Sequence, residues 1–139
     1  MTSIGKFKNH LQITIQDIKS YLDNDNEFNL HEFKINTAMS IDPRSSVKWF
    51  MDCLVPFADE ILKGNDSFFL QTEFGDMDEN YVSIVSKIKT IWTTLDNSGK
   101  NNIKRNFKLL LMLGAIAVKN EDLRLIINKH RDPANPLEF

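Results

Sequence analysis

One cysteine, five glycines and four prolines are all that this chain of 139 residues contains of these three types. A single cysteine cannot form a disulfide within the chain, so no disulfide framework holds the fold together. The glycines stand apart from one another, which excludes the glycine-rich loops that bind nucleotide phosphates. Most glycines and prolines fall between segments of periodic apolar residues, and we therefore treat them as boundaries of secondary structure.

Long apolar runs are also missing. No run approaches the roughly 18–20 residues that cross a bilayer, and the N-terminal residues Met1–Lys6 lack the apolar centre of a signal peptide. We therefore expect no membrane span and an intracellular rather than a secreted protein. The hydrophobic fraction of 42% is too high for a wholly disordered chain, and the length suits a single domain.

Apolar residues recur along most of the chain at spacings of three and four, as on one face of an amphipathic helix. This pattern predicts an all-α, single-domain bundle of about five helices over residues 1–132, followed by a C-terminal tail at 133–139. The expected helices are residues 3–22, 43–62, 80–95, 98–118 and 121–131. Residues 28–41 combine helical and strand-like spacing, and for them we expect a helical turn followed by extended chain.

Two of the expected helices have special features. The second begins with an N-cap and a proline at Asp42–Pro43, and Pro56 inside it predicts either a kink near Asp52–Cys53 or a broken helix. The fourth is apolar almost all round over residues 109–118, so we expect it to be the central buried element. Gly114 in this stretch allows another helix to approach closely.

Motifs for metal binding and catalysis are incomplete. Residues 31–35 begin like a zinc-protease helix but lack the second histidine. Residues 23–27 and 76–78 begin like calcium loops but lack the glycine and the final glutamate. Catalysis by Cys53 would need a histidine beside it, and we expect Cys53 to be a small buried hydrophobe and the three histidines to be solvated. The sequence thus predicts no enzymatic activity, no metal and no cofactor.

The formal net charge of −2 conceals two oppositely charged segments. Residues 59–79 carry seven acids and one lysine, a net of −6, and residues 80–108 carry six bases and one acid, a net of +5. Lys100, Lys104 and Lys108 are four residues apart and therefore share one face of the fourth helix. Together with the neighbouring Arg105 they form a basic stripe. The stripe is a candidate contact for nucleic-acid phosphates, for the acidic surface of a protein, or simply for solvent. The pI of 5.9 argues against nucleic acid.

Aromatic residues concentrate in and after the second helix. Trp49 and Phe57 fall off its inward apolar face, and Phe68 and Phe69 follow in a short apolar segment. Either the helix is buried on two sides, or these four residues form a partner-binding surface. We retain Trp49, Phe57, Phe68 and Phe69 as candidate partner-binding residues.

Several short segments share a pattern with a group of known proteins. They are Ile41-Asp42-Pro43, Phe50 with Leu54-Val55-Pro56-Phe57, Asp66-Ser67-Phe68-Phe69-Leu70, Ile91-Trp92-Thr93-Thr94-Leu95, and a helix with Ile103, Phe107 and Leu110. Over residues 41–111 the chain resembles small, uncharacterised helical proteins of nucleocytoplasmic large DNA viruses. The resemblance carries over no catalytic residue, and it implies a viral accessory or virion-associated protein that acts by binding.

From these observations we expect a non-enzymatic protein-interaction or structural accessory module, in a host cell or a virion. Its partner would be another protein or a second copy of the chain. The alternative is a nucleic-acid-associated regulatory factor that uses the basic stripe of the fourth helix.

Overall fold

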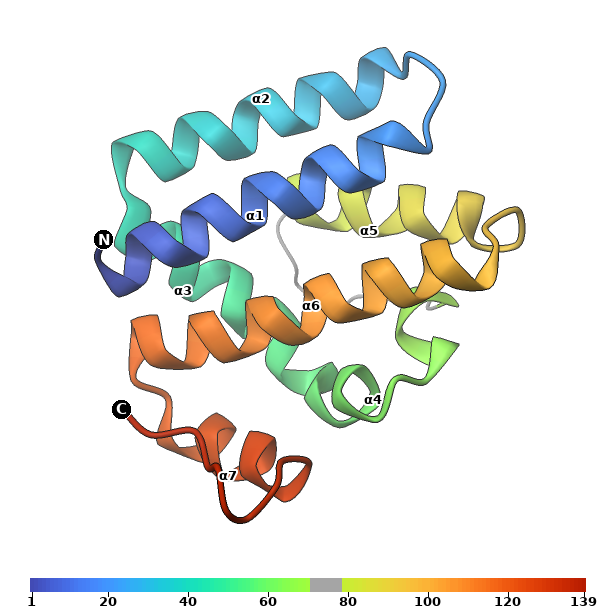
Figure 1. Ribbon diagram of the computed structural model, residues 1–139. Helices are drawn as coiled ribbons and strands as arrows, with labels where there is room; N and C mark the ends of the chain where they lie inside the picture. The colour runs from blue at the N-terminus through green and yellow to red at the C-terminus, as the bar shows by residue number, and fades with distance from the viewer. Residues whose placement is uncertain (71–78) are drawn as a thin grey trace.

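The computed structural model describes residues 1–70 and 79–139, and these residues are mostly helical (Figure 1). The elements are α1 (Ser3–Ser20), α2 (Asn26–Ile41), α3 (Pro43–Leu54), α4 (Ala58–Lys63), α5 (Glu79–Trp92), α6 (Asn97–Val118) and α7 (Glu121–Lys129), with 3₁₀ turns η1 (Val55–Phe57) and η2 (Asp66–Leu70). Within the described ranges there is no strand, and the prediction of an all-α fold is confirmed.

The segment 28–41 differs from its prediction. It lies within the continuous helix α2, so the expectation of a helical turn followed by extended chain is wrong. The carboxylate of Asp25 caps the helix by accepting from the backbone N–H of Phe28 at 3.0 Å. The strand-like alternation arises because α2 has apolar residues on two opposite faces. Ile35 and Met39 are buried, whereas Phe33 and Ile41 point away from the core.

The expected second helix is broken, and of the two predicted outcomes, a kink or a break, the break is the one observed. It begins at Pro43, where Asp42 accepts from the backbone N–H of Ser45 at 3.2 Å. α3 then ends at Leu54, Pro56 lies in the turn η1, and α4 follows. Proline cannot donate the backbone hydrogen bond that a continuous helix needs, and its ring crowds the preceding turn. The break and the helix α2 together raise the number of helices above the expected five.

The long helix α6 is central to the fold and packs against α1, α3, α4 and α7. Its residues Leu110, Leu111 and Ala115 are fully buried. The predicted close approach at Gly114 is confirmed, because a Cβ there would overlap the Sδ of Met51 from α3. One side of α6 stays accessible, since Leu109 keeps 38% of its surface exposed.

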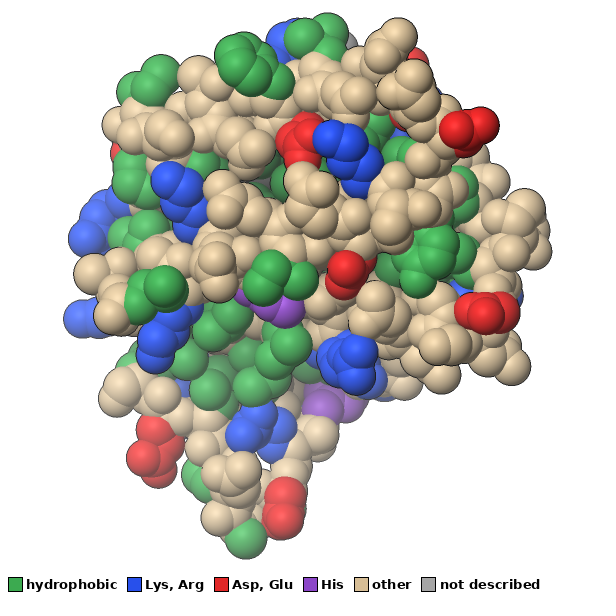
Figure 2. Space-filling view, turned by 45° about the horizontal axis from the view of Figure 1, so that its top comes forward, with side chains coloured by type: hydrophobic (Ala, Val, Ile, Leu, Met, Phe, Trp, Pro, Cys, Tyr) green, Lys and Arg blue, Asp and Glu red, His purple; other side chains and the backbone are tan. Residues whose placement is uncertain are grey.

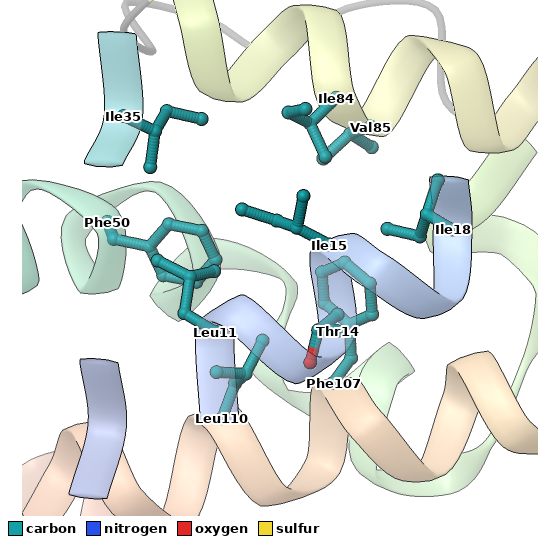
Figure 3. Close-up of a pocket in the computed structure, with 10 residues that line it drawn as sticks. All are labelled: Leu11, Thr14, Ile15, Ile18, Ile35, Phe50, Ile84, Val85, Phe107 and Leu110. Carbon is teal, nitrogen blue, oxygen red and sulfur yellow. The ribbon is translucent and has the colours of Figure 1, made fainter. Parts of the chain in front are cut away.

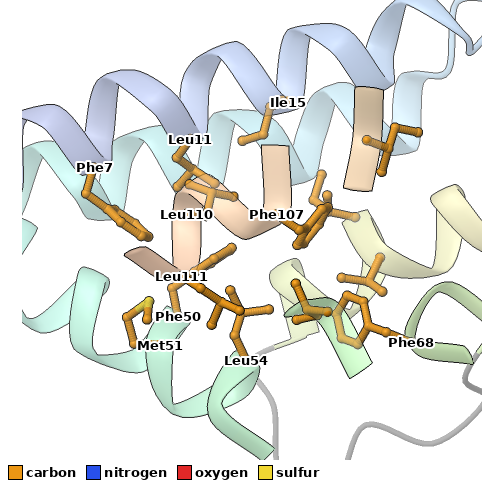
Figure 4. Packing of buried hydrophobic residues seen from close by; sticks show 14 of the residues in the cluster. Phe7, Leu11, Ile15, Phe50, Met51, Leu54, Phe68, Phe107, Leu110 and Leu111 are labelled. Atoms are coloured by element: carbon orange, nitrogen blue, oxygen red, sulfur yellow. The ribbon is translucent and has the colours of Figure 1, made fainter. Parts of the chain in front are cut away.

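Side chains from several helices meet α6 in one hydrophobic core (Figure 4). In this view Leu11 of α1 lies above the α6 residue Leu110, Phe7 of α1 lies to its left, and Phe50 and Leu54 of α3 lie below it. The C-terminal residues also reach the core, because Leu137 is only 8% exposed. Its backbone N–H donates to the side chain of Asn128 at 2.7 Å, which holds the end of the chain against α7.

Candidate interaction surfaces

The four aromatic residues proposed from the sequence as a partner surface separate in the structure. Phe68 and Phe69 are 0% and 1% exposed, so of the two alternatives, burial and a partner surface, burial holds for these two residues. Phe57 is half-buried, and its ring centroid lies 5.2 Å from that of Phe68. Only Trp49 remains mostly outside, with 60% of its surface exposed.

The turn η2 explains why Phe68 and Phe69 are buried. The ring of Phe69 stacks on Trp92 of α5, with centroids 4.6 Å apart and an interplanar angle of 12°. Asp66 begins the same turn and accepts from the indole N–H of Trp92 at 3.1 Å. The hydrogen bond from Trp92 to Asp66 joins residues 26 positions apart. These contacts therefore fold the apolar turn inward, and the local sequence pattern carries no signal of this.

A second apolar surface was not identified from the sequence. Leu30, Phe33 and Ile41 project from α2 with 51%, 67% and 79% of their surfaces exposed, and we call these three residues the α2 outer face. Spacings of three and eight place them on one side of the helix, opposite the buried Ile35 and Met39. Figure 2 shows hydrophobic side chains standing out along the upper part of this view, where α2 lies.

The basic stripe is partly used within the fold. The ammonium of Lys104 lies 2.6 Å from a carboxylate oxygen of Asp66. The ammonium groups of Lys100 and Lys104 also lie 5.8 and 6.0 Å from the centroid of the Trp92 ring, within the range of a cation–π interaction. Arg105 is exposed and donates to the side chain of Asn102 at 2.7 Å. Two of the four bases are thus held against η2 and α5.

The contact between Asp66 and Lys104 joins the acidic and basic segments of the sequence. The ammonium of Lys104 and, with a smaller effect, the indole N–H of Trp92 donate hydrogen bonds to the Asp66 carboxylate. Both lower the pKa of Asp66 below its ordinary value. Part of the charge separation seen in the sequence is therefore neutralised inside the molecule. Lys108 lies close to Gly64, which follows the last residue of α4. Its Nζ would be 3.6 Å from a Cβ added at Gly64.

The expectation that all three histidines are solvated is wrong for one of them. His31 is only 7% exposed, His10 is half-buried, and His130 is exposed beside Asp59. Cys53 is half-buried in α3. In the described parts of the chain, no three residues of the metal-binding types come together in a candidate metal site. The second calcium-like segment, residues 76–78, lies outside the described residues.

His10 lies on α1 and faces α6, where the backbone of Asn106 forms a hydrogen bond with its ring. Its Nε2 is buried and has no hydrogen-bond partner among the described residues. Burial lowers the pKa of His10 below the ordinary 6.5, although the backbone of Asn106 and the charge of Asp17 act in the opposite direction. The fold therefore favours the neutral imidazole.

This pKa shift predicts a pH dependence of stability. The unfolded chain binds the proton of His10 more readily than the folded chain, so the contribution of His10 is fully present above pH 6.5. It is lost as the pH falls through the lowered pKa. Urea denaturation above and below pH 6.5 should show a larger loss of stability for the natural chain than for His10→Gln. Equal losses in the two proteins would contradict the shift.

The enclosed cavity in the core is too small for a ligand. Its volume is about 10 Å³, close to the minimum that one water molecule needs. Side chains from α1, α2, α3, α5 and α6 line it, and Figure 3 shows Ile15, Phe50 and Ile84 among those that converge on it. The hydroxyl of Thr14, at its edge, donates to the backbone carbonyl of His10 at 2.9 Å. This cavity is therefore a packing defect at the meeting point of the helices.

The fold and these surfaces define the chain as an all-α protein with exposed apolar side chains on α2 and α3. No protein-family model, curated protein or solved structure is matched by the chain. None of the helices in the described ranges has the length and apolar character that crossing a bilayer requires.

Proposed function

We propose that this chain is a non-enzymatic module that binds a protein partner through the α2 outer face. Trp49 of α3, 60% exposed, is a further apolar side chain available to a partner. The exposure of Phe33 is the observation that carries the proposal, because 67% of this large apolar side chain contacts solvent. Burying apolar surface contributes about 25 cal/mol per Å². A partner that covers Phe33, Leu30 and Ile41 would therefore gain substantial binding free energy.

The composition of this surface supports a protein as the partner. Phenylalanine and tryptophan are frequent at the centres of protein interfaces, and tryptophan is among the residues with the largest single contributions. The α2 outer face presents three apolar side chains on one helix. Between residues 30 and 41, Lys34 is the one charged residue exposed beside them. A partner with an apolar groove or an amphipathic helix matches this pattern.

The alternative of a nucleic-acid-binding regulator is less well supported. Its central residue, Lys104, already pairs with Asp66 at 2.6 Å. A substitution at Lys104 would therefore disturb the fold as well as any phosphate contact. The exposed Arg105 is the suitable residue for testing this alternative. From the viral resemblance, we propose an infected cell or a virion as the setting in which the module binds its partner.

The proposal is tested by affinity capture from the native source with two matched variants. Phe33→Glu places a charge in the α2 outer face, and Phe139→Glu makes the same change at another exposed phenylalanine, which is 51% exposed. We expect Phe33→Glu to reduce the amount of bound partner at least tenfold, since an unpaired charge in an apolar interface costs more than about 1.4 kcal/mol. Phe139→Glu should bind normally.

Two results would contradict this proposal. One is equal capture by both variants and the natural chain. The other is capture that disappears after nuclease treatment and after Arg105→Glu, which would support the nucleic-acid alternative. Light scattering on the purified chain distinguishes binding to a second copy of the chain from binding to a different protein, because self-association would appear without any added protein.

A further inference from the structure

An open groove lies at the end of the molecule where α1 and α3 begin and α6 ends. Figure 1 shows these three helix ends close together, near the N-terminus. The groove has a volume of about 350 Å³. Ile4, Met51 and Val118 contribute aliphatic side chains to its lining, and no residue of α2 takes part. It is therefore separate from the α2 outer face.

Two cations line the same groove. Arg44 and Lys48 are both exposed and stand four residues apart on α3, so their side chains share one face of this helix. Neither forms an ion pair with any residue in the described ranges, in contrast to Lys19, Lys87 and Lys104. A negatively charged group bound here would gain two cations without displacing an existing partner.

A third charged residue narrows the choice of ligand. Asp52 lines the groove one turn beyond Lys48 on α3. A strand of nucleic acid, with a phosphate at every step, would bring negative charge against this carboxylate. A peptide can place an acidic side chain near Arg44 and Lys48 and an uncharged one near Asp52. The aliphatic lining then suits a neighbouring apolar side chain of the same peptide.

We propose that this groove binds an acidic segment of a partner protein, with a carboxylate against Arg44 and Lys48 and an aliphatic side chain against Ile4 and Val118. This site shares no residue with the α2 outer face. Either surface can therefore bind a protein when the other does not, and the two are tested separately.

The test is a titration of the isotope-labelled full chain with short peptides, followed by amide NMR shifts. The probe peptide carries glutamates next to leucines, and its two matched peptides replace either the glutamates by lysines or the leucines by serines. We expect the probe to shift amides of residues 44–52 and 117–120, and both matched peptides to bind about tenfold more weakly or not at all. No shifts with the probe, or equal shifts with the lysine peptide, would overturn the proposal.

Substitutions in the chain give an independent measure. Arg44→Glu and Lys48→Glu change exposed side chains outside the core, so both variants should fold normally. Each should weaken binding of the probe about tenfold. Lys63→Glu, at an exposed lysine on α4 outside the groove, is the control and should bind like the natural chain. An equal loss in all three variants would mean that net charge alone attracts the peptide, which would contradict a defined site.

Discussion

Phe107→Ala is expected to lower the free energy of unfolding by about 3–5 kcal/mol, the usual range for a fully buried phenylalanine. Phe107 is 2% exposed. Its ring centroid lies 5.6 Å from that of Phe68 and 5.3 Å from that of Phe69. It also borders the small central cavity, so the substitution would enlarge an existing void. Urea denaturation of the variant measures this loss.

Phe33→Ala is the matched control, because it removes the same atoms from an exposed site. We expect it to change the free energy of unfolding by less than about 0.5 kcal/mol, as for most surface substitutions. The pair thus distinguishes a phenylalanine that stabilises the fold from one that is available for binding. A loss of several kcal/mol for Phe33→Ala would show that Phe33 is packed in solution, and the proposed interaction surface would then be wrong.

Gly114→Ala is expected to lower the free energy of unfolding by about 1–3 kcal/mol, although alanine is intrinsically the better helix former by about 1 kcal/mol. The new Cβ would overlap the Sδ of Met51 and lie 2.6 Å from its Cε. Met51 is 1% exposed, so its side chain cannot move into solvent to relieve the overlap. Thermal or urea denaturation measures the change.

A second substitution tests the cause of this loss. Met51→Ala alone should cost about 2–5 kcal/mol, because it leaves a cavity between α3 and α6. In the Gly114→Ala background the same change should cost less, since it also removes the overlap. The coupling free energy of the double-mutant cycle should therefore be at least about 0.5 kcal/mol. Additive effects, or a stabilising Gly114→Ala, would contradict the close packing of α3 on α6.

The local parts of the fold could be predicted from the sequence. Asp42 and Pro43 mark the start of α3, and Pro56 marks the break that follows, because capping and the missing proline N–H act within one helical turn. The identity of α6 as the central helix also follows from its nearly continuous apolar stretch. These predictions depend only on residues that are close in the chain.

The remaining features had two different causes, a contact between distant residues and an ambiguous local pattern. Phe69 is buried because it stacks on Trp92 of α5, which only the folded chain brings next to it. Phe33 and Ile41 gave α2 a mixed pattern, because a helix with apolar residues on both faces has no single periodic stripe. Once α2 is known to be a helix, the same mixed pattern indicates that one of its apolar faces is exposed.

Site-specific photo-cross-linking in the native source tests the central proposal most directly. A photoreactive phenylalanine analogue is placed at position 33 in one sample and at position 139 in another, since both natural residues are exposed phenylalanines. We predict a covalent adduct with one partner protein from position 33 and no such adduct from position 139. Cross-links to the same proteins from both positions, or none from position 33 while the chain is in its native complex, would contradict binding through the α2 outer face.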